Sequence, residues 1–345
     1  MDKKSVLRLL KEKAPSRLAR LYKKADRVRK RNVGDQVHLR GLIEISNICG
    51  RACAYCGISR LNKKLRRYRM KKGEILASAR YAAKLGYGTV VLQAGEDTGL
   101  KKEWIAGIVR TIKSTTPLAV TLSLGERSKE ELLCWRKAGA DRYLLRFETS
   151  DKKLYAKIHP AIQGQPAPDR LRLLELLKKL GYEAGSGVMI GIPGQTYTSL
   201  ARDILLFKSL DLDMIGVGPF LPHPATPLGR AAMRPPLVKD PVPNTEEMVY
   251  KVIALTRLVR PDANIPSTTA LATINRKSGR EKGLRRGANI VMPNLTPMKY
   301  RKYYEIYPAK ACLFETPERC NRGLKRRILS MGRKIGKGPG GRKKG

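Results

Sequence analysis

Short apolar runs alternate along the chain with longer segments in which apolar residues recur every three or four positions. The short runs predict β-strands, and the periodic segments predict amphipathic α-helices. The predicted strands span 40–46, 88–93, 117–123, 142–148, 186–192, 213–218, 263–269 and 288–293. The clearest helical segments span 73–86, 128–138, 168–181, 198–210 and 245–260. Gly86, Gly139 and Gly181 each follow a helical segment and precede a strand, as glycines that end helices do.

This alternation predicts the class of fold. Strands that are apolar throughout, separated by helices, indicate a parallel sheet that is covered by those helices. Eight such units predict an α/β protein with a (β/α)8 barrel of the TIM type, and an open barrel of six units is the alternative.

The chain divides into three predicted regions. Residues 1–37 predict a helical extension, and residues 38–323 predict the barrel with a C-terminal cap. Residues 324–345 end in GRKIGKGPGGRKKG, a basic sequence of low complexity. We expect this C-terminal tail to be disordered, because it offers few apolar groups to bury.

Three of the six cysteines lie directly after the first predicted strand. Cys49, Cys53 and Cys56 occur in the sequence NICGRACAYCG, with the spacing C-x3-C-x2-C. Three thiolates can hold a [4Fe–4S] cluster and leave its fourth iron open to a ligand with amino and carboxylate groups, such as S-adenosylmethionine. The alternatives are a structural zinc ion with a distant fourth ligand from Cys134, Cys312 or a histidine, and unreactive thiols that bind no metal.

Polar and glycine-rich sequences follow the ends of other predicted strands. Gln93-Ala94-Gly95-Glu96-Asp97 follows the second strand, Glu148 ends the fourth, and Gly191-Ile192-Pro193-Gly194 follows the fifth. Parallel barrels carry their chemistry at the carboxyl ends of their strands. We therefore expect one functional rim that includes the three cysteines.

Composition narrows the class of protein. The 345 residues include 71 Lys+Arg and 29 Asp+Glu, a formal net charge of +42 that attracts polyanions. Nucleic acid is a possible partner, but aromatic residues make up only 6% of the chain, which is few for a base-stacking surface. No apolar run reaches membrane-spanning length and no secretory leader is evident, so we expect a cytoplasmic protein that does not bind membranes.

Several long sequences resemble those of a known enzyme family. They run in order over about 35–320 and include SNICGRACAYCGISRLNKKLRRYRM, VVLQAGED, YLLRFETSDKKLYAKIHP, GSGVMIGIPGQT, DMIGVGPFLPHPATPL and ANIVMPNLTPMKYRKYYEIYPAKAC. In these sequences the chain resembles the radical S-adenosylmethionine (radical SAM) superfamily and its biotin-synthase-like branch. Within that branch the resemblance is closest to the HydE family of [FeFe]-hydrogenase maturases.

The resemblance implies a set of site residues. Cys49, Cys53 and Cys56 would hold one [4Fe–4S] cluster, and Tyr55 would shield it from solvent. The residues that would bind S-adenosylmethionine are Gln93, Gly95, Glu96, Glu148, Arg170, Gly191 and Pro193. The residues that would line the substrate cavity and serve catalysis are Thr121, Arg146, Met214, Thr268, Thr269, Tyr304 and Tyr307.

One feature of the chain departs from the family. Some HydE proteins carry an accessory cluster on three cysteines near the C-terminus, and this chain has Cys312 and Cys320 there. Gly323 stands at the third position. Two thiolates make a poor iron–sulfur site, so we expect the accessory cluster to be absent or labile.

The resemblance also implies a function and partners. The enzyme would use a 5′-deoxyadenosyl radical, formed by reductive cleavage of S-adenosylmethionine, on a sulfur-containing Fe(CO)2(CN)–cysteine precursor of the hydrogenase H-cluster. A partner radical SAM maturase would supply this precursor, a ferredoxin or flavodoxin would supply electrons, and a scaffold GTPase maturase would take part. The alternatives are an enzyme of the methylornithine-synthase type and an RNA-modifying radical SAM enzyme.

Overall fold

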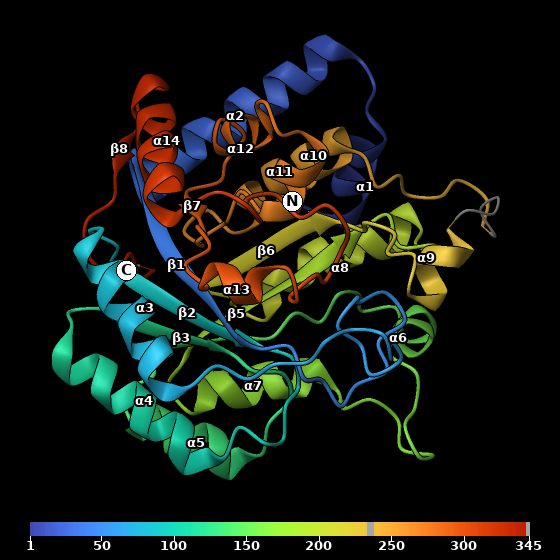
Figure 1. Cartoon of the computed structure of the whole chain (residues 1–345). Helices are drawn as coiled ribbons and strands as arrows, with labels where there is room; N and C mark the ends of the chain where they lie inside the picture. Colours follow the sequence, from blue (N-terminus) through green and yellow to red (C-terminus); the bar gives the residue numbers. More distant parts are fainter. Residues whose placement is uncertain (233–237, 343–345) are drawn as a thin grey trace.

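Parallel strands form the centre of the molecule in the computed structural model, which describes residues 1–232 and 238–342 (Figure 1). Neighbouring strands pair in the order β6-β5-β4-β3-β2-β1-β7. The strands are β1 (Gln36–Ser46), β2 (Thr89–Ala94), β3 (Ala119–Ser123), β4 (Arg142–Leu144), β5 (Glu183–Ile190), β6 (Met214–Pro219) and β7 (Ile290–Val291). A further short strand, β8 (Lys334–Ile335), pairs with the start of β1.

An irregular segment, residues 263–267, fills the gap between β6 and β7. The backbone N–H of Ile215 donates to the carbonyl of Asn264 at 2.9 Å, and the N–H of Ser267 donates to the carbonyl of Ile290 at 2.9 Å. Because β7 pairs with β1, these bonds complete a ring of eight parallel staves. The predicted (β/α)8 barrel is therefore confirmed.

Several predicted strands are shorter than the apolar pattern suggested, including 288–293, which is reduced to β7. The expected strand 263–269 forms only isolated bridges at Asn264 and Pro266, because proline has no N–H with which to continue a ladder. Beyond Pro266, Thr268 caps the next helix. The expected strand 142–148 ends at Leu144, although a bridge at Glu148 keeps the chain beside β5.

Helices surround the barrel, and each of the clearest predicted helices is present. They correspond to α3 (Lys72–Lys84), α5 (Lys129–Lys137), α7 (Arg170–Lys179), α8 (Tyr197–Ser209) and α10 (Glu246–Val259). The other helices are α4 (Lys102–Thr115), α6 (Lys152–Ile158), α9 (Pro227–Ala231), α11 (Thr269–Ile274), α12 (Gly279–Leu284), α13 (Met298–Arg301) and α14 (Pro317–Ser330). Gly86 and Gly139 follow α3 and α5 with φ of 77° and 103°, the left-handed backbone that favours glycine after a helix.

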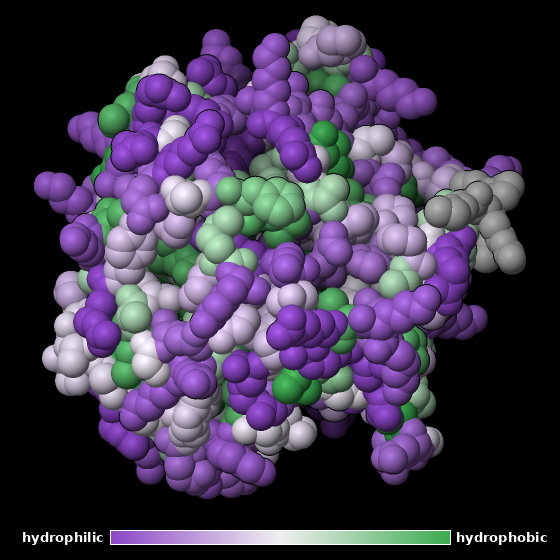
Figure 2. All heavy atoms as spheres, viewed as in Figure 1, coloured by the Kyte–Doolittle hydropathy of each residue, from purple (hydrophilic) through white to green (hydrophobic). Residues whose placement is uncertain are grey.

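Apolar side chains gather in the core, and hydrophilic side chains lie at the surface. Apolar side chains of α4 at Ile105, Ile108, Val109 and Ile112 are fully buried against the barrel, at the spacing of one helix face. Hydrophilic side chains cover most of the face that Figure 2 shows. None of the helices in the described parts of the chain has the length and apolar character needed to span a bilayer.

Two helices precede the barrel, α1 (Lys3–Lys11) and α2 (Pro15–Val33). They pack on α8 and α10, with Leu18, Leu21 and Ala25 of α2 buried. The buried Lys251 of α10 donates through Nζ to the carbonyl of Glu12 at 2.6 Å, which ties the turn between α1 and α2 to the barrel wall. The helical extension expected at the N-terminus is thus packed against the outer helices.

The C-terminal tail is ordered through residue 342, so the prediction of disorder from residue 324 was wrong over that range. Residues 343–345 lie outside the described residues. After α14 and β8, the tail enters the amino-terminal mouth of the barrel, beside the start of β2 (Figure 1). There the carbonyl of Pro339 accepts from Thr89 Oγ1 at 2.9 Å, and that of Gly340 accepts from the fully buried Arg40 Nη2 at 2.9 Å.

This order has a physical cause that composition does not show. Arg40 and Arg142 face the inside of the barrel base with almost no exposed surface, and a buried guanidinium needs acceptors. The tail supplies them as backbone carbonyls, since the carbonyl of Pro339 also accepts from Arg142 Nη2 at 3.2 Å. Glycines on both sides allow this close approach, because a Cβ on Gly88 would lie 1.7 Å from the Gly338 carbonyl oxygen and one on Gly340 would lie 2.5 Å from the His38 ring.

Arg342 anchors the end of the described tail through three carboxylates. Its Nη1 lies 2.9 Å from Asp211 and 3.0 Å from the fully buried Asp213, and its Nε lies 2.5 Å from Asp262. Burial alone would raise the pKa of Asp211, but hydrogen bonds from Lys178 and Arg342 lower it to about 2. The base of the barrel therefore closes with an ion-pair network.

We expect Arg342→Ala to destabilise the protein by about 1–3 kcal/mol, because it leaves the buried Asp213 carboxylate without its cation. The matched control is Arg172→Ala on the surface of α7, where the side chain is 87% exposed. That change should stay within about 0.5 kcal/mol of the wild type. Urea unfolding measures both. Equal stability of the two variants would contradict the proposed anchoring of the tail.

His38 makes the barrel base sensitive to pH. Burial, together with the positive charges of Arg40 and Arg142, lowers the pKa of His38 to about 4, against about 6.5 in an unfolded chain. The stability that depends on neutral His38 is therefore present above pH 6.5 and is lost as the pH falls towards 4. We expect the free energy of unfolding to decrease from pH 7.5 to pH 5, and to decrease less in His38→Gln. The same decrease in both proteins would show that His38 does not titrate in this way.

Candidate active site

The carboxyl ends of the barrel strands surround a cavity of about 330 Å³. Its wall includes side chains from β1, β2, β5 and β6, from the loops after β1 and β4, and from the cap segment 304–310. Because side chains alternate along each strand, every second residue faces the inside of the barrel. Leu42 and Glu44 of β1, and Met214, Gly216 and Gly218 of β6, line the cavity in this way.

All but three of the predicted site residues line this cavity. Those that do are Cys49, Cys53, Tyr55, Cys56, Gln93, Gly95, Glu96, Arg146, Glu148, Arg170, Met214, Thr268, Thr269, Tyr304 and Tyr307. They come from strands and loops that are up to 258 residues apart in sequence, from Cys49 to Tyr307, and the barrel brings them to one rim. Their individual roles stay predictions.

Thr121, Gly191 and Pro193 are the exceptions. Thr121 is fully buried two residues before Ser123, which does line the cavity, so it faces the barrel interior one layer deeper. Gly191 has φ of 78°, and a Cβ there would lie 2.5 Å from Asn244, so its glycine is explained by packing. Contact of Gly191 or Pro193 with an adenine ring stays a prediction.

The cysteine loop is packed directly on the loop after β2. The backbone N–H of Glu96 donates to Cys49 Sγ at 3.4 Å, and the N–H of Gly50 donates to the carbonyl of Glu96 at 2.8 Å. Gly95 permits this contact, because a Cβ there would lie 2.3 Å from the Ile48 carbonyl oxygen and 2.8 Å from Cys49 Cβ. The two loops therefore form one unit, in which a glycine sets the position of the first cysteine.

The three thiols need a cation to become thiolates. Burial raises the pKa of all three, and it raises that of Cys53 to about 12. At neutral pH such thiols stay protonated unless a metal ion binds them, since coordination deprotonates a thiol outright. Sulfur donors in this environment fit an iron–sulfur or zinc centre.

The arrangement of the sulfur atoms distinguishes these two centres. Tetrahedral zinc with Zn–S bonds of about 2.3 Å would draw its thiolates to roughly 3.8 Å from one another. Among the described residues, Cys49, Cys53 and Cys56 do not gather their three sulfur atoms within 4.8 Å. Each thiolate of a [4Fe–4S] cluster binds a different iron, which requires no such approach. The geometry favours the cluster over zinc.

A buried ion-pair frame stands beside the cysteines. Arg170 Nε donates to Glu126 Oε1 at 2.7 Å, and its Nη1 donates to the carbonyl of Arg146 at 2.8 Å. On the other side of Glu126, Arg51 Nε lies 3.4 Å from Oε2. The sequence prediction paired Arg170 with a cofactor carboxylate and did not select Glu126 or Arg51, although Glu126 follows the third strand at the rim.

Glu148 is held in a strained backbone conformation. Its φ of 63° is unfavourable for a residue with a side chain, and such strain concentrates at functional sites. The carboxylate is 5% exposed, with Oε2 3.0 Å from Arg146 Nη2 and Oε1 3.5 Å from the Tyr55 hydroxyl. Tyr55 also approaches His159 Nε2 at 3.3 Å.

Several buried polar atoms around the cavity form no hydrogen bond within the described chain. They are Arg146 Nε, Thr121 Oγ1, Glu126 Oε2 and Glu148 Oε2, although the two carboxylate oxygens are in ion pairs with Arg51 and Arg146. Buried polar atoms are almost always satisfied in folded proteins, so such a group indicates a polar ligand or ordered water. A ligand with both amino and carboxylate groups would suit a rim that offers carboxylates and guanidinium groups together.

Sequence reasoning missed a second buried ion pair, between Glu44 and Lys310. Both side chains line the cavity, with 0% and 4% of their surface exposed, and Lys310 Nζ binds Glu44 Oε1. Asn294 Nδ2 donates to the other carboxylate oxygen at 3.0 Å, and the ammonium group lies 5.2 Å from the centre of the Tyr304 ring. A glutamate inside the apolar run GLIEIS was the observation that could have identified this pair.

The chain is similar in sequence and in fold to known enzymes. Residues 43–207 match the Radical SAM superfamily. The chain is 47% identical to the [FeFe] hydrogenase maturase subunit HydE of Thermotoga maritima, over 94% of this chain and 89% of that one. It is 31% identical to a 3-methylornithine synthase of Methanosarcina acetivorans, over 82% and 76% of the two chains. A crystal structure of methylornithine synthase superposes with a TM-score of 0.81 and 26% identity, over 97% of this chain and 94% of that one.

We expect Gly95→Ala to lower the iron bound after anaerobic reconstitution to roughly half or less, because the added methyl must displace the backbone that carries Cys49. Gly323→Ala is the matched control, since a Cβ on Gly323 in α14 would meet nothing within 4 Å. Iron analysis and circular dichroism measure loading and folding. Full iron content in a folded Gly95→Ala protein would contradict the role assigned to this contact.

Proposed function

The chain belongs to the radical S-adenosylmethionine superfamily and is a radical SAM enzyme, and we propose that it takes part in maturing the H-cluster of an [FeFe]-hydrogenase. The observation that carries the proposal is the 47% identity to the HydE maturase, which extends over 94% of this chain and 89% of its relative. The identity to methylornithine synthase is lower, at 31%, and covers less of both chains.

The family implies a [4Fe–4S] cluster and S-adenosylmethionine, and the residues present fit both. Cys49, Cys53 and Cys56 would hold the cluster, on a loop whose position Gly95 sets. The reduced cluster, when bound, supplies the electron that cleaves S-adenosylmethionine to a 5′-deoxyadenosyl radical. Glu126 Oε2 and Glu148 Oε2, which form ion pairs but no hydrogen bond within the described chain, support binding of a ligand that donates hydrogen bonds beside the cysteines.

The chain's own residues would orient this cofactor. Glu148 would accept from its hydroxyl or amino hydrogens, because the carboxylate is held at the rim by strained backbone. Arg170 donates through Nε to Glu126 and through Nη1 to the carbonyl of Arg146. Its Nη2 would therefore donate to the carboxylate of S-adenosylmethionine. Tyr55, packed on His159, would cover the cluster from solvent, and the pKa of Tyr55 is raised well above its usual value by burial.

The substrate in this proposal is a sulfur-containing Fe(CO)2(CN)–cysteine complex. The carbon radical would bond to its sulfur while the bond between that sulfur and the cysteine Cβ breaks, which leaves the unpaired electron on Cβ. Thr268, Thr269 and Arg146 would donate hydrogen bonds to it, and Met214 would provide an apolar wall. Tyr304 adds a hydroxyl donor, and Lys310, whose charge is paired with Glu44, adds N–H donors to the same cavity, where they would bind the polar groups of the complex. The small cavity would exclude water from the radical.

The proposed partners follow from the same function. A partner radical SAM maturase would make the iron complex, a ferredoxin or flavodoxin would deliver electrons, and a scaffold GTPase maturase would receive the product. The cytoplasm is the proposed location, because a few cysteines clustered as metal ligands are typical of a reducing compartment.

Maturation of a hydrogenase in a host that lacks only its HydE tests the proposal. We expect the wild-type chain to restore hydrogen evolution, and Glu148→Gln to reduce it about 10- to 100-fold, the effect of losing a hydrogen bond to a charged group. The matched control is Glu175→Gln, which changes an exposed glutamate of α7 and should retain full activity.

Assays with the purified, reconstituted enzyme address the alternatives. The proposal predicts that an iron–cysteine complex stimulates formation of 5′-deoxyadenosine. Formation of methylornithine would instead identify a methylornithine synthase, and methylation or thiolation of RNA would identify an RNA-modifying enzyme. Either product, together with failure to restore hydrogen evolution, would overturn the proposal.

A further inference from the structure

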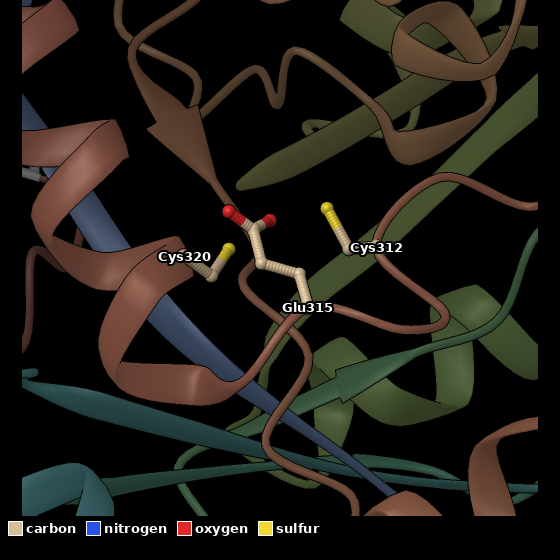
Figure 3. Close-up of side chains that lie close together, drawn as sticks. All are labelled: Cys312, Glu315 and Cys320. Atoms are coloured by element: carbon tan, nitrogen blue, oxygen red, sulfur yellow. The ribbon is translucent and has the colours of Figure 1, made fainter.

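Two cysteines and a glutamate gather at the C-terminal cap, outside the cavity described above. Cys312 lies in the loop before α14, Cys320 lies in the first half of α14, and Glu315 lies between them in sequence. Figure 3 shows the Glu315 carboxylate between the two sulfur atoms in that view. One ligand atom from each residue lies within 4.8 Å of the other two.

We propose that these three residues bind a single thiophilic divalent cation, with Zn²⁺ the ion whose preferences fit, in place of an accessory iron–sulfur cluster. Zinc accepts cysteine sulfur at about 2.3 Å and carboxylate oxygen at about 2.0–2.2 Å. Ligand atoms around such an ion lie roughly 3.5–3.8 Å apart, so small side-chain movements would complete the site. A water molecule would take the fourth position.

The donor set does not fit a cluster. An iron–sulfur cluster on a protein loop depends on several thiolates, and this cap offers two. Gly323, one turn beyond Cys320 on α14, contributes no ligand atom, and a Cβ added there would meet nothing within 4 Å. Glu315 replaces the missing sulfur with a carboxylate oxygen, a ligand that zinc accepts in three-residue sites.

Two buried arginines lie beside the site, and their positive charges favour an anionic group there. Arg280, 8% exposed, donates through Nη2 to Cys312 Sγ at 3.4 Å, and its Nε has no partner among the described residues. Arg301, 1% exposed, donates through Nη1 to the carbonyls of Cys312 at 3.2 Å and Glu315 at 2.6 Å. Two thiolates and one carboxylate around a dication leave one negative charge, which the adjacent Arg280 offsets.

The backbone and the exposure of the site also fit a metal. Cys312 has φ of 67°, a left-handed conformation that is rare for cysteine and that sets the direction of its side chain. Cys320 is 2% exposed, whereas Cys312 and Glu315 are partly exposed. The site is therefore anchored on its inner side and open to an ion from solvent.

The proposed ion would hold in place a chain segment that lines the active cavity. The segment that carries Tyr304, Tyr307 and Lys310 into the cavity ends two residues before Cys312. A metal that joins Cys312 and Glu315 to Cys320 would tie this segment to α14. This structural clamp does not depend on the identity of the substrate.

Cobalt(II) binding to the full-length, reconstituted enzyme tests the site, with Zn²⁺ then added to displace it. We expect one Co²⁺ per chain, with the absorption band of a cobalt–thiolate bond, and loss of that band on addition of Zn²⁺. Cys320→Ser should abolish the band, and Arg280→Gln should weaken binding about 10- to 100-fold, as for partners that support metal ligands. Cys134→Ser, on the outer helix α5, is the matched cysteine control and should bind normally.

Two further measurements distinguish loss of the metal site from loss of the fold. Glu315→Gln changes a partly exposed side chain, and we expect it to bind cobalt more weakly while it folds as the wild type does. Zinc should slow hydrogen exchange of residues 303–316 in the wild type and leave it unchanged in Cys320→Ser. Three results would overturn the proposal: iron beyond four atoms per chain that Cys320→Ser removes, a Cys312–Cys320 disulfide in the freshly isolated protein, or cobalt binding that survives Cys320→Ser.

Discussion

Closure of the barrel is the constraint on which the rest of the molecule depends. Backbone hydrogen bonds from β6 to Asn264, and from Ser267 to β7, join the two ends of the sheet into a ring. In a closed parallel ring every strand ends at the same mouth, so loops that are distant in sequence must face one another. Cys53 after β1, Glu148 after β4 and Thr268 after the irregular stave meet in one cavity for this reason.

Buried charged side chains lie at both mouths of the barrel, and their partners differ between the two. At the amino end, carbonyls of the C-terminal tail accept hydrogen bonds from the buried Arg40 and Arg142. At the carboxyl end, Glu126 Oε2 and Glu148 Oε2 pair with Arg51 and Arg146 but form no hydrogen bond within the described chain. Buried polar atoms without a hydrogen bond occur at both mouths, since Arg40 Nε and His38 Nδ1 also lack one. Arg146 and Glu148 differ in that they line the cavity, where a ligand can supply the missing partner. The opposite mouth is a closed structural base.

The two cysteine groups differ in what their surroundings can hold. Cys49, Cys53 and Cys56 stand apart on a loop that is packed against Gly95, with burial that keeps free thiols protonated. Cys312 and Cys320 lie close together with a carboxylate and with buried arginines beside them. The first arrangement suits a cluster in which each cysteine sulfur binds a different iron, and the second suits a single metal ion. Sequence spacing alone does not separate these cases.

Much of the fold and of the candidate site was predictable from local pattern. Helix and strand periodicity identified the barrel, and the C-x3-C-x2-C spacing together with long family sequences identified the cysteine loop and most cavity residues. These features are local, because a periodicity or a spacing depends on neighbours in sequence. The exact extent of the stave at 263–267 was less predictable, since Pro266 interrupts a ladder that tertiary pairing nevertheless completes.

Tertiary structure decided the features that depend on distant partners. The tail was expected to be disordered from its composition, yet it is ordered because Arg40 and Arg142 need its carbonyls. Arg170 was assigned to a cofactor, and the fold pairs part of its guanidinium with Glu126. The Glu44–Lys310 pair joins residues 266 positions apart, a contact that no local pattern contains. The sequence by itself therefore determined which elements form and which residue types reach the rim, whereas packing decided which charges pair, because pairing requires positions that only the closed barrel supplies.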